Sequence, residues 1–168
     1  MDPTLIAILR LIHIVLGAIW VGGAVVTAFY ILPTARALGP AGAQFTGALV
    51  QRARLPLALV IMGSIAILAG IALYAILYAG GPMSSTSVVL GIGGAIAIVV
   101  LVIGIVVTKP AADKLVALGQ AIAGQGSPPT PAQTEERNRL ASRLRTAAIV
   151  NAVLLLVAIA CMAVARYV

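Results

Sequence analysis

Four long apolar runs constrain what this chain can fold into more than any other feature. They cover residues 5–32, 55–78, 88–108 and 147–165 of the 168-residue sequence. Because the hydrocarbon core of a bilayer is about 30 Å thick and needs about 20 apolar residues per helix, each run has spanning length to within a residue or two. The runs show no alternation with a period of two, and a backbone in lipid must satisfy its own hydrogen bonds. The sequence therefore predicts an all-α bundle of four transmembrane helices, forming one integral membrane domain over residues 1–168.

Composition and charge exclude several classes of protein. Hydrophobic residues make up 62% of the chain and charged residues 9%, which excludes an ordinary water-soluble domain. The net charge of +7 would suggest nucleic-acid binding in a soluble protein, but here the basic residues stand at the ends of apolar runs, so we expect no nucleic-acid partner. The single cysteine, Cys161, allows neither an internal disulfide nor a zinc cluster.

No motif for phosphate binding, nucleophilic catalysis or paired carboxylates occurs in the chain, so the sequence assigns no catalytic residue and leaves open whether the protein is an enzyme. The acidic residues are Asp2, Asp113, Glu135 and Glu136, all outside the predicted hydrocarbon layer. A proton pump built on an intramembrane carboxylate is therefore not expected.

The distribution of basic residues predicts the orientation in the membrane. Of the 11 Lys and Arg residues, nine lie in the segments between the first and second runs and between the third and fourth runs. Only Arg10 and Arg166 lie near the chain ends, and residues 80–87 carry no charge. Because positive residues stay on the cytoplasmic side, we expect both basic segments in the cytoplasm and both termini outside, in a prokaryotic inner membrane. A cleaved signal peptide begins with basic residues, whereas this chain has Asp2 there. The sequence therefore favours a mature first helix over a cleaved signal peptide.

The segment 109–146 is expected to form a helical stub on the cytoplasmic side. Residues 111–123 have helical spacing of apolar side chains and continue the third helix beyond Pro110, and residues 124–131 then break the chain with three prolines. Thr130, Pro131 and Gln133 predict a capping box, so the fourth helix begins near residue 131. The basic residues of the stub are interpreted as a solvated flank that sets topology. A surface for acidic lipids or a protein partner is the alternative.

Small residues four apart occur in every run and permit close helix packing, since such pairs let helix backbones approach one another in lipid. They are interpreted as ordinary bundle packing, and they also permit a homodimer or a larger membrane complex. The pairs are Ala18 and Gly22, Ala66 and Gly70, Gly93 and Ala97, and Ala148 and Ala152.

The only histidine stands in the first run with three other residues at helical spacing. Arg10 precedes His13 by three residues, Gly17 follows it by four and Trp20 by seven, so all four lie on one stripe of the helix. Ionisable groups at that depth are costly unless they meet a partner or water, which makes them candidates for function. Arg10 could pair with an acidic group such as a haem propionate, His13 could supply imidazole to a metal, and Gly17 leaves room for a flat ring. Haem is the first interpretation, a hydrogen-bonded structural histidine the second and a copper site the third.

Three short motifs in the same run carry a resemblance to known proteins: Leu11-Ile12-His13-Ile14, Trp20-Val21-Gly22-Gly23 and Phe29-Tyr30-Ile31-Leu32-Pro33. They resemble the first helix of a group that includes the CopD-type copper-resistance proteins, the HemJ-type protoporphyrinogen oxidases and uncharacterised four-helix relatives. The last of these fit the length of this chain best. In the haem-binding members the first-helix histidine is an axial ligand of haem b. The resemblance therefore implies that role for His13.

One histidine cannot supply both axial ligands of a haem within one chain. A five-coordinate haem, a second ligand such as methionine, and a symmetric dimer all stay open. Met162 lies about 6 Å below Arg166 by helical rise, in the same leaflet as His13, and is the candidate second ligand. Arg166 is placed with Arg10 near the propionates.

The resulting hypothesis is a haem b protein that carries electrons or performs redox chemistry near the outer face of the membrane. One alternative is a copper-handling protein with soft ligands. A second alternative is a non-catalytic structural subunit of a membrane complex. The copper site would use His13 with Met162, Cys161 or Met83.

Overall fold

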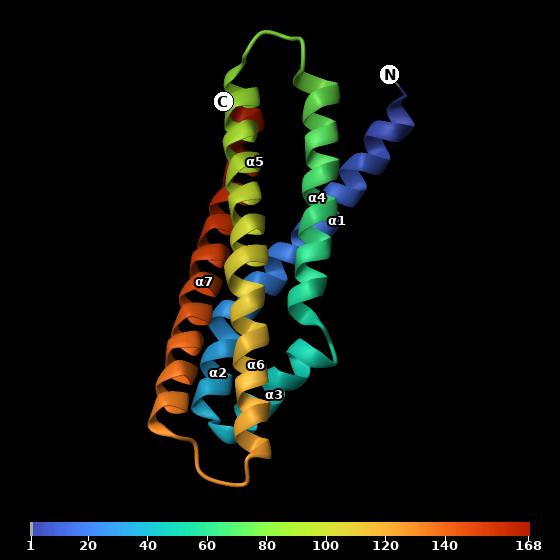
Figure 1. The fold of residues 1–168 in the computed structure, drawn as a ribbon. Helices are drawn as coiled ribbons and strands as arrows, with labels where there is room; N and C mark the ends of the chain where they lie inside the picture. The colour runs from blue at the N-terminus through green and yellow to red at the C-terminus, as the bar shows by residue number, and fades with distance from the viewer. Residues whose placement is uncertain (1) are drawn as a thin grey trace.

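The computed structural model describes residues 2–168, and these residues form helices joined by short turns (Figure 1). Four continuous helical segments are long and apolar enough to cross a membrane: Pro3–Ala37, Leu55–Tyr78, Ser85–Gly124 and Pro131–Tyr167. The all-α bundle of four membrane-length helices predicted from the apolar runs is thereby confirmed. Large apolar side chains such as Leu11, Ile14 and Leu68 face outward. The outer surface of the bundle therefore suits lipid.

The first segment contains α1 (Pro3–Val26), the π-helix η1 (Thr27–Ile31) and α2 (Leu32–Ala37), and a separate helix α3 (Pro40–Gln51) follows it. The second segment is α4 (Leu55–Tyr78), with the same bounds as the second predicted run. The third consists of α5 (Ser85–Ile103), the π-helix η2 (Gly104–Thr108) and α6 (Lys109–Gly124). The fourth consists of α7 (Pro131–Val164) and the short 3₁₀-helix η3 (Ala165–Tyr167).

Side-chain caps mark where α1 and α7 begin. The Asp2 carboxylate accepts a hydrogen bond from the Thr4 N–H at 2.9 Å at the start of α1. At the start of α7 the Gln133 N–H donates to Thr130 Oγ1 at 3.2 Å, and the Thr130 N–H donates to Gln133 Oε1 at 2.8 Å. These two bonds form the capping box predicted from the sequence. The fourth helix begins at residue 131 as expected.

Each π-helix lies directly before a proline that would otherwise interrupt a membrane helix. η1 precedes Leu32 and Pro33, and η2 precedes Lys109 and Pro110. A proline has no N–H to donate, and its ring clashes with the carbonyl four residues earlier in an α-helix. A wider turn relieves that clash, so the helix continues past the proline. This explains why the first segment extends to Ala37, beyond the end of the apolar run at Leu32, and why α6 continues the third helix as predicted.

The segment between the first and second runs is more ordered than its sequence suggested, because it contains α3. Gly39 adopts a φ of +56°, which turns the chain between α2 and α3. A Cβ atom on Gly42 would lie 1.8 Å from the Ala35 carbonyl oxygen, so only glycine permits this approach. Sequence reasoning did not predict α3.

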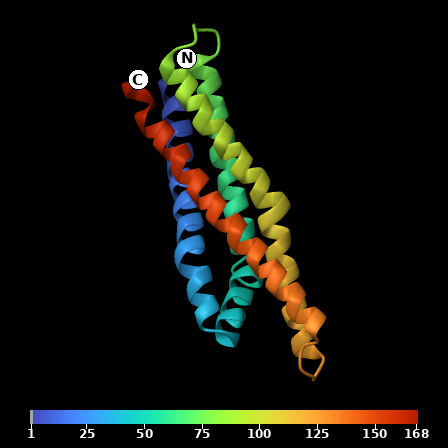
Figure 2. The same ribbon diagram turned by 90° about the vertical axis from the view of Figure 1, so that its left-hand side faces the viewer.

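The helices are arranged as two pairs, in which α1 packs mainly against α4 and α5 mainly against α7. Figures 1 and 2 show that both chain termini and the loop 79–84 lie at one end, here called the terminal end. The other end, called the basic end, holds α2, α3, α6 and the first half of α7. α1 runs obliquely across the bundle, so that its first turns diverge from α5 and α7.

Small and medium-sized residues fill the bundle interior. One buried cluster joins Trp20 and Val21 of α1 with Ala97 and Val100 of α5 and Leu155 of α7. A second joins Ala28 of η1 with Ala148 and Ala152 of α7. Those alanines form one of the predicted small-residue pairs, whereas Ala18 and Gly22 of α1 face outward. The remaining two pairs lie at helix contacts.

Candidate functional site

His13 lies between α1 and α4 in the half of the bundle nearer the terminal end. Its Nδ1 is 2.7 Å from the Ala66 carbonyl oxygen of α4. Because a carbonyl can only accept a hydrogen bond, Nδ1 carries a proton and donates it, and in the neutral ring Nε2 is then the nitrogen with the free lone pair. A metal-ligating histidine commonly donates its other ring N–H to a backbone carbonyl in this way, which fixes the tautomer and the ring orientation.

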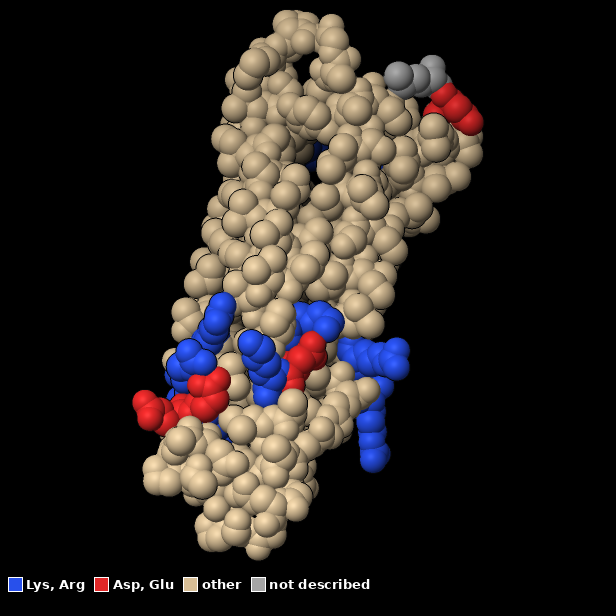
Figure 3. Space-filling view, in the orientation of Figure 1, with Lys and Arg blue, Asp and Glu red and all other residues tan. Residues whose placement is uncertain are grey.

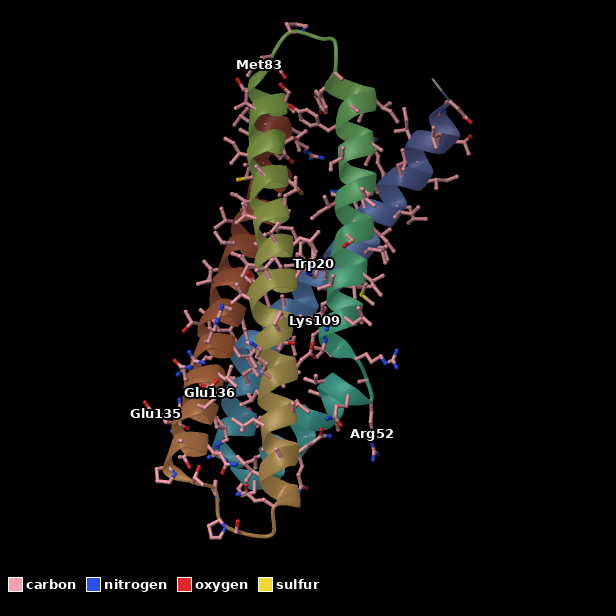
Figure 4. All side chains as sticks on the ribbon, in the orientation of Figure 1. Trp20, Arg52, Met83, Lys109, Glu135 and Glu136 are labelled. Atoms are coloured by element: carbon pink, nitrogen blue, oxygen red, sulfur yellow. The ribbon has the colours of Figure 1, made fainter. Side chains whose placement is uncertain are left out.

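Two glycines of α4 make room for the large side chains of α1. A Cβ atom on Gly70 would lie 2.7 Å from His13 Cε1, and one on Gly63 would lie 2.6 Å from Trp20 Cε2. His13 and Trp20 are seven residues apart, as are Gly63 and Gly70, so the antiparallel helices meet in matched register. Sequence reasoning missed this contact surface, although the equal spacing was a signal for it. Figure 4 shows Trp20 at mid-height of the bundle, between the ribbons of α4 and α5.

Gly17, on the turn between His13 and Trp20, borders open space. No atom of a neighbouring element lies within 4 Å of the position that a Cβ atom would occupy. No neighbouring helix therefore packs against α1 at Gly17 itself.

Arg10 and Arg166, the two arginines predicted to lie with the propionates, are both exposed on the surface of the bundle. Neither takes part in the ion pairs found among residues 2–168. The Arg166 guanidinium lies 4.5 Å from the centre of the Tyr167 ring and also donates to its hydroxyl. Figure 3 shows the Lys and Arg side chains of this face gathered in a band at the basic end, and Arg10 and Arg166 lie outside that band.

Met162, the predicted second ligand, lies against α5. The Met162 Cγ and the Cys161 Cβ are 3.3 Å and 3.2 Å from the position that a Cβ atom on Gly93 would occupy. Both side chains thus line the α5–α7 contact, and the structure does not place Met162 against His13. Within residues 2–168 no three His, Cys, Asp or Glu side chains gather as a metal-binding cluster.

A second polar group in the apolar layer was missed by sequence reasoning. Asn151 of α7 is buried, and its Nδ2 donates to Thr108 Oγ1 of η2 at 3.2 Å. Its Oδ1 is the one buried side-chain polar atom without a hydrogen-bond partner in the part of the chain that the structure describes. The pair borders a cavity of about 70 Å³ that reaches from Lys109 to Trp20. The signal was the presence of the only asparagine within an apolar run.

The chain matches no protein-family model, no curated protein and no solved structure. The functional proposal therefore depends on the chemistry of these residues and on the motifs of the first helix.

Proposed function

We propose that this protein is a haem b-binding integral membrane protein that carries electrons or performs redox chemistry near the terminal end of the bundle. The observation that carries the proposal is the hydrogen bond from His13 Nδ1 to the Ala66 carbonyl at 2.7 Å, because a neutral ring that donates this bond keeps the lone pair of Nε2 for a metal. The open space at Gly17 and the resemblance of the first helix to haem-binding proteins support the same conclusion.

The residues present fit one axial ligand and a set of flanking groups. His13 would hold the iron, Arg10 and Arg166 would lie near the propionates, and Gly17 and Trp20 would border the ring. Haem b supplies a one-electron couple between ferric and ferrous iron. Met162 would be the second axial ligand, and to reach the iron its side chain would have to leave its contact with Gly93 of α5. The proposed setting is a prokaryotic inner membrane with both termini outside the cytoplasm, and the proposed partners include a second copy or a larger complex.

The experiment is an absorption spectrum of the protein purified from cells supplied with a haem precursor. We expect a Soret band that shifts on reduction with dithionite and is lost in His13→Ala. Added imidazole should restore the band to His13→Gly, because a free ligand can replace the missing side chain. Ile14→Ala, one residue away and facing outward, is the matched control and should keep the band.

Partial losses are expected at the flanking positions. Gly17→Leu should weaken haem retention by filling the ring's space, and Arg10→Gln or Arg166→Gln should reduce it less. A full, unshifted spectrum in His13→Ala would overturn the ligand assignment. A colourless protein that retains copper through His13 would support the copper alternative. A protein that holds neither metal would leave the bond to Ala66 as a structural link between α1 and α4.

A further inference from the structure

A polar pocket lies between α6 and α7 at the basic end, away from His13. It has a volume of about 120 Å³. Its walls include Lys114 of α6 and Arg139 and Arg143 of α7, with Glu136 as the only acidic residue. Figure 3 shows Lys and Arg gathered in a band at this level of the molecule, and Figure 4 locates Glu136 on α7 beside α6.

The charges around the pocket do not balance. Glu136 is engaged by Arg139, whose Nε and Nη2 donate to the two carboxylate oxygens at 2.8 Å each. Lys114 and Arg143 take part in no ion pair among residues 2–168. After the Glu136–Arg139 pair is set aside, two positive charges from two different helices remain. Because charge-assisted hydrogen bonds from Lys and Arg are the usual way to bind phosphate oxygens, the remaining cations suit a phosphate group.

The height of the pocket matches the headgroup layer of a membrane. Arg143 precedes the apolar part of α7 by four residues and Lys114 follows Thr108 by six, which places them about 6 Å and 9 Å beyond the apolar layer. The headgroup region extends roughly 5–8 Å beyond the hydrocarbon core on each side, and long basic side chains can bend toward it. Both cations can therefore reach lipid phosphates.

Apolar side chains continue from the pocket along both helices into the hydrocarbon layer. Val106 forms part of the pocket wall and is 63% exposed. On α5, Val102 and Val99 are exposed above it at helical spacing. On α7, Val150 is exposed seven residues after Arg143, on the same face of the helix. A ligand with a phosphate and an apolar chain would match this surface better than a soluble anion would.

We propose that the pocket binds the phosphodiester headgroup of an anionic phospholipid, whose acyl chains lie along the exposed valines of α5 and α7. The residues that bind the phosphate are Lys114 and Arg143. Glu136 and Arg139 form the pocket's lower wall on α7.

The test compares two double variants that remove the same charge. The pocket variant is Lys114→Gln with Arg143→Gln. The control is Arg137→Gln with Arg145→Gln, two basic residues of α7 that do not line the pocket. Each protein is titrated with phosphatidylglycerol and with phosphatidylcholine of the same acyl chains, and bound lipid is counted by native mass spectrometry. We expect the pocket variant to lose about tenfold or more in phosphatidylglycerol affinity, because it removes the charge-assisted hydrogen bonds that Lys114 and Arg143 would donate to the phosphate. The control should change much less.

Three results would overturn the proposal. Equal losses in the two double variants would show a diffuse basic flank without a site. Equal binding of phosphatidylglycerol and phosphatidylcholine to the wild type would exclude a preference for anionic lipid. Inorganic phosphate that displaced the lipid at millimolar concentration would indicate a soluble anion as the occupant. If the pocket double variant fails to fold, Arg143→Gln is compared with Arg145→Gln, which lies two residues along the same helix.

Discussion

At the scale of single residues, the α1–α4 contact depends on two glycines. The rings of His13 and Trp20 occupy the positions that side chains on Gly70 and Gly63 would need. In both cases the atoms that a Cβ would meet belong to aromatic rings, which cannot bend away as an aliphatic chain can. Close packing in this contact therefore requires glycine at both positions.

We expect Gly63→Ala and Gly70→Ala to destabilise the protein by about 1–3 kcal/mol each, the usual cost of overpacking a tight contact. The measurement is unfolding in detergent micelles by circular dichroism. Gly22→Ala and Gly94→Ala are matched controls, because no neighbouring atom lies within 4 Å of a Cβ there, and they should be neutral or stabilising. Equal effects at all four positions would contradict the contact described between α1 and α4.

Glu136 controls the charge of the α6–α7 pocket. The hydrogen bond from Arg139 holds the pKa of Glu136 below its ordinary value of 4.5, with the charge of Lys114 lowering it further. Glu136 is therefore ionised at neutral pH. Because its folded-state pKa is depressed, any stability from the Glu136–Arg139 pair is present above the unfolded pKa and lost as pH falls through the folded value.

Removing this carboxylate should strengthen binding of anionic lipid, since Arg139 is then freed for the phosphate. We expect Glu136→Gln to raise phosphatidylglycerol affinity severalfold in the titration above, and wild-type affinity to stay flat between about pH 7 and pH 5. Glu135→Gln, at a residue that does not line the pocket, is the control. Weaker binding in Glu136→Gln would mean that the carboxylate orders the site.

At the scale of elements, the turn between α6 and α7 is held by a pair of glutamines. Gln133 Nε2 donates to Gln125 Oε1 at 2.9 Å, and Gln125 Nε2 donates to the Ser127 carbonyl at 3.1 Å. The residues between Gly124 and Pro131 are exposed and form no helix. The counterpart turn at Gly39 is far shorter, because α2 and α3 pack closely at Gly42.

Limited proteolysis at the basic end should therefore cut first within residues 125–130 and leave the spans intact. A protease without basic specificity is needed, because this segment contains no Lys or Arg. Gln133→Ala should speed the cut by releasing Gln125, whereas Gln120→Ala, an exposed glutamine of α6, should not. First cleavage in α2 or α3 would show that the wrong segment had been identified as accessible.

At the scale of the whole molecule, the basic residues other than Arg10 and Arg166 lie at one end of the bundle. The loop 79–84 and both termini lie at the other (Figure 1). The asymmetry predicts that the basic end faces the cytoplasm, because translocating so many positive charges is unfavourable.

Single cysteines in a Cys161→Ser background test this orientation with an impermeant thiol reagent. Met83→Cys, in the loop at the terminal end and 86% exposed as methionine, should label in intact cells. Ser127→Cys, in the turn at the basic end, should label only after the cells are opened. The reverse pattern would invert the orientation.

Most of the bundle could be predicted from the sequence because its causes act within single helices. Apolar length determined the four spans, and the capping box at Thr130 determined where α7 begins. The stripe of Arg10, His13, Gly17 and Trp20 follows from helical periodicity alone. α3 escaped prediction because its short helix is stabilised by the close approach at Gly42, which involves a carbonyl of another element.

Only the tertiary structure decided what these side chains meet. The contacts at these sites are made by residues far apart in the sequence. They are the bond from His13 to Ala66, the packing of His13 and Trp20 against glycines of α4, the contact of Asn151 with Thr108, and the pocket that the cations of α6 and α7 share. Hydropathy determines that a helix enters the membrane, but in lipid it hardly distinguishes one helix face from another. The register between helices is determined by the fit of small residues against large ones, and that fit exists only once the helices are packed together.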